Sequence, residues 1–254
     1  MMDSLRNMLV MIELELRRLK HDRTELYTRA VQPILWIVIY GPIMSTVATI
    51  PTGGVSYTSY ITPGVLIQST TFVAIFYGLT IVWERESGIL KKLLVTPASR
   101  YATVIGRSMA SGVRGIFQAL VIVPVALIIG VRFVPNIGYF VSALLIIFFA
   151  SGGFAAISIL IASFMKTRER FMGIGQAITF PLFFASNALY PVQSMPLILQ
   201  WFSRVNPMSY IVDAVRGLMI NGNLTNLPTD LAAIALFDAI MFVIASASFK
   251  RIIE

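Results

Sequence analysis

The sequence predicts an all-α membrane protein with six transmembrane helices, for three reasons. Of the 254 residues, 57% are hydrophobic and only 13% are charged, whereas soluble domains carry about 25% charged residues. The mean hydropathy is +0.80. Apolar runs close to the roughly 20 residues that cross a bilayer as a helix recur between short charged segments. A soluble domain of this length cannot bury so many apolar side chains, so we expect a multi-pass protein of the cell membrane.

The N-terminal segment, residues 1–29, predicts an amphipathic helix in the cytoplasmic membrane interface. Its apolar side chains recur at steps of three and four, which places them on one helix face. These residues are Leu5, Leu9, Ile12, Leu16 and Leu19. A helix packed on a partner protein would show the same pattern. We therefore divide the chain into this interface helix and a six-span transmembrane domain, residues 30–254.

Six apolar runs predict the spans. They cover residues 30–50, 60–83, 106–130, 138–165, 171–190 and 231–249. Gly41-Pro42 should bend the first span, because proline removes a backbone donor and clashes with the preceding turn. The small centre of the fourth span, around Gly152-Gly153, should let a neighbouring backbone approach closely. Arg107 and Arg114 share one face of the third span, and their long stems should carry the charges towards water or headgroups.

The segment 84–100 is a charged stretch between the second and third spans, and it follows an uncharged run from Ala30 to Trp83. Six of its residues are ionisable, with both signs present, so the segment must face water. Its apolar residues form a strip, as in amphipathic helices that dock into a groove of a partner. A cytoplasmic coupling helix is therefore expected here. The alternative is a solvated loop held at the headgroups by lysine.

The segment 191–228 differs from the spans because it combines four prolines with many apolar residues. It is too interrupted for one span and too apolar for a free loop. One or two short re-entrant helices in the outer leaflet are expected, covered by other parts of the protein. Asp213 and Arg216 are three residues apart on such a helix and are expected to form a structural pair.

The distribution of lysine and arginine sets the expected orientation, since these residues concentrate in cytoplasmic loops. They cluster before the first span, in residues 84–100, in the Lys166–Arg170 turn and at the C-terminus. Both termini are therefore expected in the cytoplasm. The net charge of +8 belongs to these loops, so binding of nucleic acid is not expected.

The residue inventory excludes several kinds of chemistry. The chain has no cysteine and a single histidine, His21, so thiolate chemistry and histidine-rich metal sites are excluded. The pattern of a phosphate-binding P-loop is absent, so any nucleotide hydrolysis must come from a partner chain. We expect no metal, no cofactor and no catalytic residue in this chain.

Two groups of residues are candidates for a pathway through the membrane. Phe180, Phe184 and Asn187 give the fifth span an aromatic flank with one amide, which suits an amphipathic substrate or, equally, core or dimer packing. Asp238 lies inside the sixth span, where an ionisable residue costs about 2.5–3.5 kcal/mol or more on insertion scales. It is expected either to make a polar contact in the pathway or to remain wet near the outer surface.

Three stretches resemble the type-2 ATP-binding-cassette exporter permeases, which include drug-resistance and nodulation-factor export permeases. The loop from Glu84 to Arg100, with Leu93-Leu94-Val95-Thr96-Pro97, looks like the loop after the second span of that family. Tyr60-Ile61-Thr62-Pro63-Gly64 and the stretch from Asn206 to Gly217 are similar to two further family patterns. The three stand in the family's order and cover the chain. Lys91 departs from the family, which often has an acidic residue shortly after the glycine.

The resemblance implies a dimer, most simply a homodimer, of six-span subunits that export hydrophobic or amphipathic compounds, drug-like or lipid-like. Each subunit would contact a separate ATPase subunit, which holds ATP and magnesium. The contact residues so implied are Glu84, Arg85, Glu86, Gly88, Leu93, Leu94, Arg100, Lys166 and Arg168. Export of a lipid-linked glycan or polysaccharide is the alternative within this class. An intramembrane enzyme or a passive channel is less favoured, because Asp238 has no second carboxylate or histidine at membrane depth and charged rings are absent.

Overall fold

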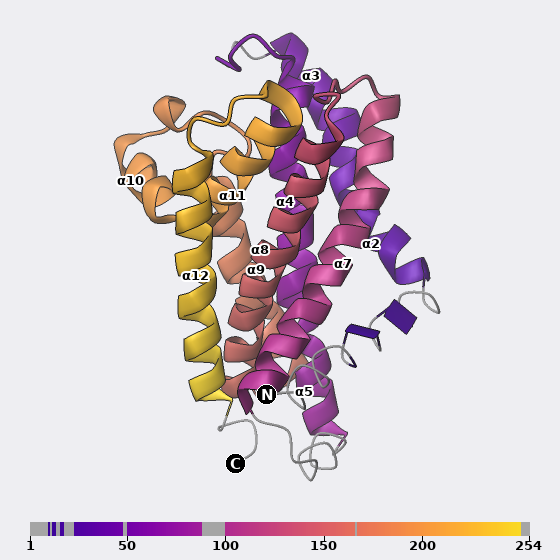
Figure 1. Ribbon diagram of the computed structural model, residues 1–254, viewed down its shortest axis with the longest axis vertical. Helices are drawn as coiled ribbons and strands as arrows, with labels where there is room; N and C mark the ends of the chain where they lie inside the picture. The colour runs from indigo at the N-terminus through magenta and orange to yellow at the C-terminus, as the bar shows by residue number, and fades with distance from the viewer. Residues whose placement is uncertain are drawn as a thin grey trace.

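Long helices that run roughly parallel make up the computed structural model of this protein (Figure 1). The structure describes residues 10, 12–13, 16–17, 23–47, 50–87, 100–165 and 167–249. All regular structure in these ranges is helical. Of the predicted interface helix, residues 1–29, the structure describes 10, 12–13, 16–17 and 23–29. All of these are helical, and Arg17 pairs with Glu13 at 2.7 Å.

The first span is one continuous helix with a π-helical turn in its middle. It consists of α2 (Arg23–Leu35), η1 (Trp36–Tyr40) and α3 (Gly41–Val47). The backbone N–H of Gly41 bonds to the carbonyl of Trp36, five residues earlier, so one extra residue is accommodated in the turn. This irregular turn directly precedes Gly41-Pro42, where the sequence predicts a bend. The helix already begins at Arg23, so it crosses the boundary expected at residue 30.

The second span is divided into two helices at Gly78. α4 (Tyr57–Tyr77) begins at Ser56, whose side chain accepts a hydrogen bond from the backbone of Ser59, and α5 (Leu79–Glu86) follows the break. α4 is buried along nearly its whole length, because other helices surround it. The span predicted at residues 60–83 is therefore longer, and it contains an interruption that was not predicted.

A serine from another helix fills the break at Gly78. The hydroxyl of Ser158 on α8 donates to the carbonyl of Ile75 and accepts a hydrogen bond of 2.7 Å from the backbone N–H of Gly78. A Cβ added at Gly78 would lie 2.0 Å from this hydroxyl oxygen. Glycine is required here because any side chain would displace the serine that satisfies the open helix ends.

The third and fourth spans, α7 (Arg100–Ile128) and α8 (Ile137–Phe164), pack closely against each other and against α4. Asn136 begins α8, and its side chain accepts hydrogen bonds from the backbone of Gly138 and Tyr139. The sequence predicts that a neighbouring backbone approaches the small centre of α8, but the atoms closest to Gly153 belong to side chains. A Cβ added at Gly153 would lie 1.9 Å from Asp238 on α12.

Arg107 and Arg114 point into the bundle, which corrects the expectation that they reach towards water or headgroups. The side chain of Arg107 is 11% exposed and pairs with Glu84. Arg114 is buried, with its guanidinium 5.2 Å from the centre of the Tyr77 ring. The arginines share a face, as predicted, but that face contacts the second span, where a carboxylate and an aromatic ring provide partners.

The fifth predicted span is shorter in the structure. α9 (Arg168–Phe184) has 17 residues, and buried turns replace the helix up to Tyr190, where the sequence predicts helix. The segment 191–228 then forms η2 (Val192–Ser194), α10 (Leu197–Val205), α11 (Pro207–Arg216) and η3 (Gly217–Asn221). α11 is buried against α4, α8 and α12, whereas α10 projects from the bundle with exposed apolar side chains (Figure 1).

Five helical stretches within the described residues are long and apolar enough to cross a membrane. They are Tyr27–Val47, Tyr57–Glu86, Thr103–Ile128, Ile137–Phe164 and Leu227–Ser248, the last of these being α12. α9 is not among them, so the six-span layout remains a prediction. We name the two ends of the bundle after the helices found there: the α5 end, at the bottom of Figure 1, and the α3 end, at the top.

Candidate functional site

A buried ion pair joins the second span to the third at the α5 end. Arg107 Nη2 on α7 donates to Glu84 Oε2 on α5 over 2.6 Å, and the two side chains are 11% and 10% exposed. Charge-assisted hydrogen bonds of this kind are short and strong. Because each charge would be buried without a partner if the other were removed, the pair holds the end of α5 against α7.

A second, more exposed ion pair joins α5 to α9. Arg168 Nε donates to Glu86 Oε2 over 2.7 Å, and its guanidinium carbon lies 6.0 Å from the centre of the Trp83 ring. Arg168 is the first residue of α9 and Glu86 the last of α5. The end of the second span is thus connected to both α7 and α9, through carboxylates two residues apart.

Of the nine residues implied for an ATPase contact, the structure brings three together: Glu84, Glu86 and Arg168. Arg85 lies between the two carboxylates on α5 and is partly exposed, and Arg100 is the first residue of α7. The remaining four lie outside the described residues: Gly88, Leu93, Leu94 and Lys166. The site at this end is therefore the junction of α5, α7 and α9.

Arg216 forms a second junction, near the α3 end. It is 3% exposed and donates to the carbonyls of Tyr60 at 3.2 Å, Asn187 at 2.7 Å and Ala188 at 3.5 Å. Its guanidinium carbon also lies 3.9 Å from the centre of the Tyr60 ring. Burial lowers the pKa of the guanidinium from its ordinary value, and Tyr60 and Asp213 act in the opposite direction.

Two of the sequence stretches that resemble family patterns meet at this junction. Tyr60 and Gly64 belong to one, and Arg216 and Asn206 to the other. A Cβ added at Gly64 would lie 2.4 Å from the carbonyl oxygen of Ala188, so α4 packs directly on the turn after α9. Asn206 begins α11 and also donates to the carbonyl of Leu182 over 2.7 Å. Residues of both stretches therefore hold the turn after α9 in position.

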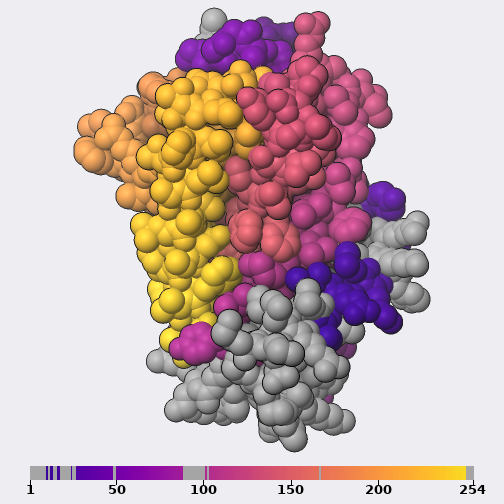
Figure 2. All heavy atoms as spheres, viewed as in Figure 1, coloured from indigo at the N-terminus to yellow at the C-terminus, as the bar shows by residue number. Residues whose placement is uncertain are grey.

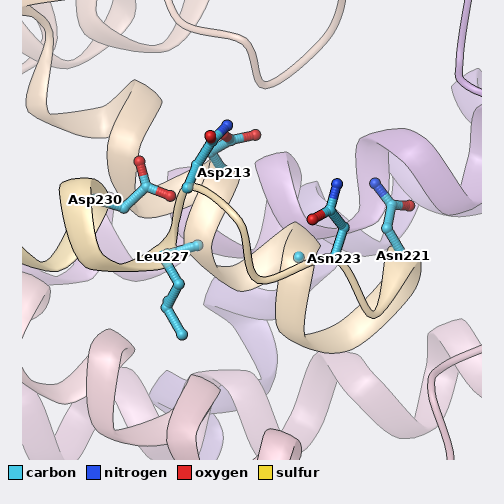
Figure 3. Close-up of a pocket in the computed structure, with 8 residues that line it drawn as sticks. Asp213, Asn221, Asn223, Leu227 and Asp230 are labelled. Carbon is cyan, nitrogen blue, oxygen red and sulfur yellow. The ribbon is translucent and has the colours of Figure 1, made fainter.

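Asp213 and Arg216 have separate hydrogen-bond partners in the structure. Asp213 accepts from the side-chain amides of Asn187 at 3.5 Å and Asn226 at 3.4 Å. It also lines a small cavity together with Asp230 (Figure 3). A larger neighbouring cavity of about 290 Å³ shares Asp213, Asn226 and Asp230 with it and is also lined by Asn187. The α3 end thus has a polar recess with two carboxylates and several amides.

The residues predicted for a pathway are not brought together. Phe180 and Phe184 are 41% and 44% exposed on α9, with ring centres 6.4 Å apart. Asn187 is buried in the turn after α9, where its carbonyl binds Arg216. Asp238 lies apart from these, in the wall of a cavity between α8 and α12. Within the described residues, no group of three or more metal-binding side chains is found.

The sequence did not reveal two of the most important residues, Arg107 as the partner of Glu84 and Ser158 as the residue that fills the break at Gly78. A signal existed for Arg107, because an arginine in the first turns of a span and a glutamate at the end of the preceding span lie at the same depth. For Ser158 the sequence gives no signal, since serine is common in apolar helices.

Known proteins resemble this chain over most of its length. A protein named as a transport permease, ycf38, from Cyanophora paradoxa is 28% identical over 207 residues, which cover 79% of this chain and 70% of the relative. DrrC of Mycobacterium tuberculosis, named as a doxorubicin resistance ABC transporter permease protein, is 28% identical over 214 residues, 82% of this chain and 74% of the relative. Nodulation protein J of Rhizobium leguminosarum bv. trifolii is 23% identical over 201 residues, 78% and 76% of the two chains.

The family model described as "ABC-2 type transporter" matches residues 6–220. This match includes the α5–α7–α9 junction and the Arg216 junction. The match covers most of the chain. It agrees with the apolar helices of membrane-spanning length in the structure. This chain therefore belongs to the ABC-2 type transporter family.

Proposed function

We propose that this chain is the transmembrane permease subunit of an ATP-binding-cassette exporter. It moves hydrophobic or amphipathic compounds outward across the cell membrane, and a separate ATPase subunit binds and hydrolyses the ATP. The observation that carries this proposal is the double connection of α5, through Glu84–Arg107 and Glu86–Arg168. A permease that is moved by a separate ATPase subunit needs a structural connection between the segment that contacts the ATPase and several spans at once. α5 provides such a connection.

The same geometry suggests how force enters the membrane. The segment 84–100 and the Lys166–Arg170 turn contact the ATPase, on the cytoplasmic side together with both termini. When two ATPase subunits close on ATP, α5 is displaced, and the ion pairs carry the displacement to α7 and α9. Two copies of the six-span permease then change their mutual packing and open a route outward. The Glu84–Arg107 pair suits this role because both of its side chains are buried and its geometry is therefore fixed.

The substrate class rests on the character of the exposed surfaces. Phe180 and Phe184 present aromatic rings at the surface of α9, and DrrC is named for resistance to a drug. Both favour apolar or amphipathic drug-like or lipid-like compounds. A second candidate is the export of a lipid-linked glycan, because the polar recess with Asp213, Asp230 and Asn226 offers hydrogen-bond acceptors and donors to sugar hydroxyls.

Co-purification followed by transport tests the proposal. The tagged full-length chain is isolated from its own host in mild detergent, and an ATPase that contains a P-loop should be present in the complex. The complex is reconstituted into proteoliposomes, and ATP-dependent movement of a fluorescent amphipathic drug is measured. An ATPase variant without its P-loop lysine is the control. Transport that persists with this variant, or that needs no ATPase subunit, would show that the chain is a channel or an ion-driven carrier.

The two substrate classes are separated in the same vesicles. Asp213→Asn and Asp230→Asn change the polar recess and leave the aromatic face of α9 intact. If lipid-linked glycans are the cargo, these variants should reduce ATP-dependent transfer of a glycolipid, and the drug should not move in the wild type. If drugs are the cargo, Phe184→Ala should reduce transport more than either aspartate variant.

A further inference from the structure

A cavity of about 640 Å³ lies between α8, η3 and α12. α8 and α12 are neighbours on the face of the molecule shown in Figure 2. The cavity walls are mostly apolar, with Leu145, Ile146, Phe149, Leu231, Ile234 and Phe242 among the lining side chains. Cavities of roughly 300–1,000 Å³ with apolar walls and a few polar groups are typical of small-molecule sites.

One carboxylate, that of Asp238, lies in the wall of this cavity. Asp238 is 7% exposed, and within the described part of the chain its Oδ1 has no hydrogen-bond partner. This oxygen lies against α8 at Gly153, where an added Cβ would come within 1.9 Å of it. The glycine provides the room that the carboxylate occupies, but it brings no side-chain donor. The acid is therefore enclosed by the helices without being neutralised by them.

Three basic side chains of the described bundle are engaged elsewhere. Arg216 binds backbone carbonyls near the α3 end, Arg107 pairs with Glu84, and Arg168 pairs with Glu86. The other charged residue within α12, Asp230, is itself acidic. Among the described residues, no ion pair or hydrogen bond connects Asp238 to a lysine or arginine. An unpaired carboxylate in apolar surroundings is strongly disfavoured, so a positive group from outside the chain would be bound favourably.

We propose that this cavity binds lipophilic organic cations, with the positive nitrogen of the ligand next to Asp238 and its apolar body between α8 and α12. Charge complementarity selects this class of ligand, because a neutral lipid tail would fill the apolar walls and leave the carboxylate unpaired. The rim is apolar as well: Leu145, Phe149 and Leu231 are 52%, 50% and 44% exposed. A lipophilic cation that has partitioned into the bilayer can thus enter from the side.

If this chain is an exporter subunit, as proposed above, the cavity defines the class of substrate that it transports. A role of the cavity in transport therefore rests on the proposed function. Binding, however, is a property of the permease alone. It is measured without ATPase subunits and without ATP, so a failure to bind and a failure to transport are distinguished.

The test uses the full-length chain in lipid nanodiscs and two fluorescent probes that differ in one charge. Dansylcadaverine carries a primary ammonium group at neutral pH, and its N-acetyl derivative is neutral. Dansyl emission rises in apolar surroundings, and empty nanodiscs provide the background from lipid. The wild-type chain is expected to bind the cation at least tenfold more tightly than the neutral derivative.

Two variants and one control assign the binding to this cavity. Asp238→Asn keeps the shape of the side chain and removes its charge, so it should lower the affinity for the cation about tenfold and leave the neutral probe unchanged. Ala235→Phe places a ring in the cavity wall and should weaken both probes. Asp213→Asn removes a carboxylate from the polar recess at the α3 end and should alter neither affinity.

Equal affinity of the two probes for the wild-type chain would overturn the proposal, and it would show a groove for neutral apolar tails such as those of lipids. Preference for the cation that survives Asp238→Asn would also overturn it. If Asp238→Asn does not fold, as judged by size-exclusion chromatography, Ala235→Phe alone tests whether the cation binds in this cavity, because it leaves the carboxylate in place. Unchanged binding of the cation by Ala235→Phe would place the ligand elsewhere.

Discussion

Glu84 on α5 and Arg107 on α7 form an ion pair of 2.6 Å in which neither side chain is more than 11% exposed. The pair lies at the end of the second span, where α5 meets α7. Glu86, two residues further on, forms its pair with Arg168 in a more exposed position, with side chains 35% and 46% exposed. The two pairs therefore differ in burial while they connect the same helix, and this difference makes their contributions separable by experiment.

Glu84→Gln should cost about 3–5 kcal/mol in stability, because it leaves Arg107 buried without its counter-charge. Glu86→Gln, the matched control in the exposed pair, should cost about 1 kcal/mol or less. Thermal unfolding in detergent measures both. Glu84→Gln should also reduce ATP-dependent transport per inserted molecule at least tenfold. The double variant Glu84→Arg with Arg107→Glu should recover part of the stability, and equal melting temperatures for Glu84→Gln and Glu86→Gln would contradict the assignment.

Gly78→Ala should destabilise the protein by about 1–3 kcal/mol, because the added methyl group overlaps the Ser158 hydroxyl and the backbone of α8. The matched control is Gly173→Ala on α9, where an added Cβ meets no atom within 4 Å. That control should be neutral or slightly stabilising, since alanine restricts the unfolded chain. Melting temperatures from fluorescence-detected size exclusion compare the two. A Gly78→Ala variant as stable as the wild type would refute the role of Ser158 at this break.

Arg216→Lys should destabilise the protein despite keeping the positive charge, because an ammonium group cannot reproduce the planar set of donors that reaches three carbonyls. Each lost hydrogen bond to a charged group is worth about 1.5–3 kcal/mol. Arg204→Lys is the control, because Arg204 is exposed. Its guanidinium carbon lies 4.9 Å from the centre of the Trp201 ring. The yield of monodisperse protein after detergent extraction is the measurement. Similar yields for the two lysine variants would speak against the Arg216 junction.

Single cysteines test the orientation directly, because the chain has none of its own. Asn223 and Ser87 are both exposed. Ser87 directly follows α5, whereas Asn223 precedes α12, which starts at the opposite end of the bundle (Figure 1). With the proposed topology, Asn223→Cys should react with an impermeant maleimide on intact cells. Ser87→Cys should react only after the cells are opened. The reverse labelling pattern would invert the protein in the membrane and exclude the exporter model.

The spans were predictable because a bilayer imposes length and apolarity on each helix separately. α8 covers residues 137–164 where the sequence predicts 138–165, and its pattern needs no knowledge of neighbours. α9 was overestimated for the same reason. The run up to Tyr190 is apolar enough for a helix, but the chain turns after Phe184, where Arg216 and Asn206 bind carbonyls of the turn and of Leu182.

The contacts within the candidate site were less predictable, because they depend on which helices become neighbours. The family resemblance identified Glu84, Glu86 and Arg168, and the structure shows that they lie at one junction. It could not show that Asp238 would face a glycine on α8, or that Arg216 would bind backbone carbonyls rather than Asp213. Charge spacing along one helix suggests a pair, but tertiary packing decides whether a closer partner is available.

The Arg216 junction also sets an order of assembly. All three of its carbonyl partners precede it in the chain, and Tyr60 does so by 156 residues. During synthesis the start of α4 therefore emerges long before the arginine that fixes it, and it must be held by other contacts in the meantime. The junction closes only when α11 arrives, so the last third of the chain completes the packing of the first.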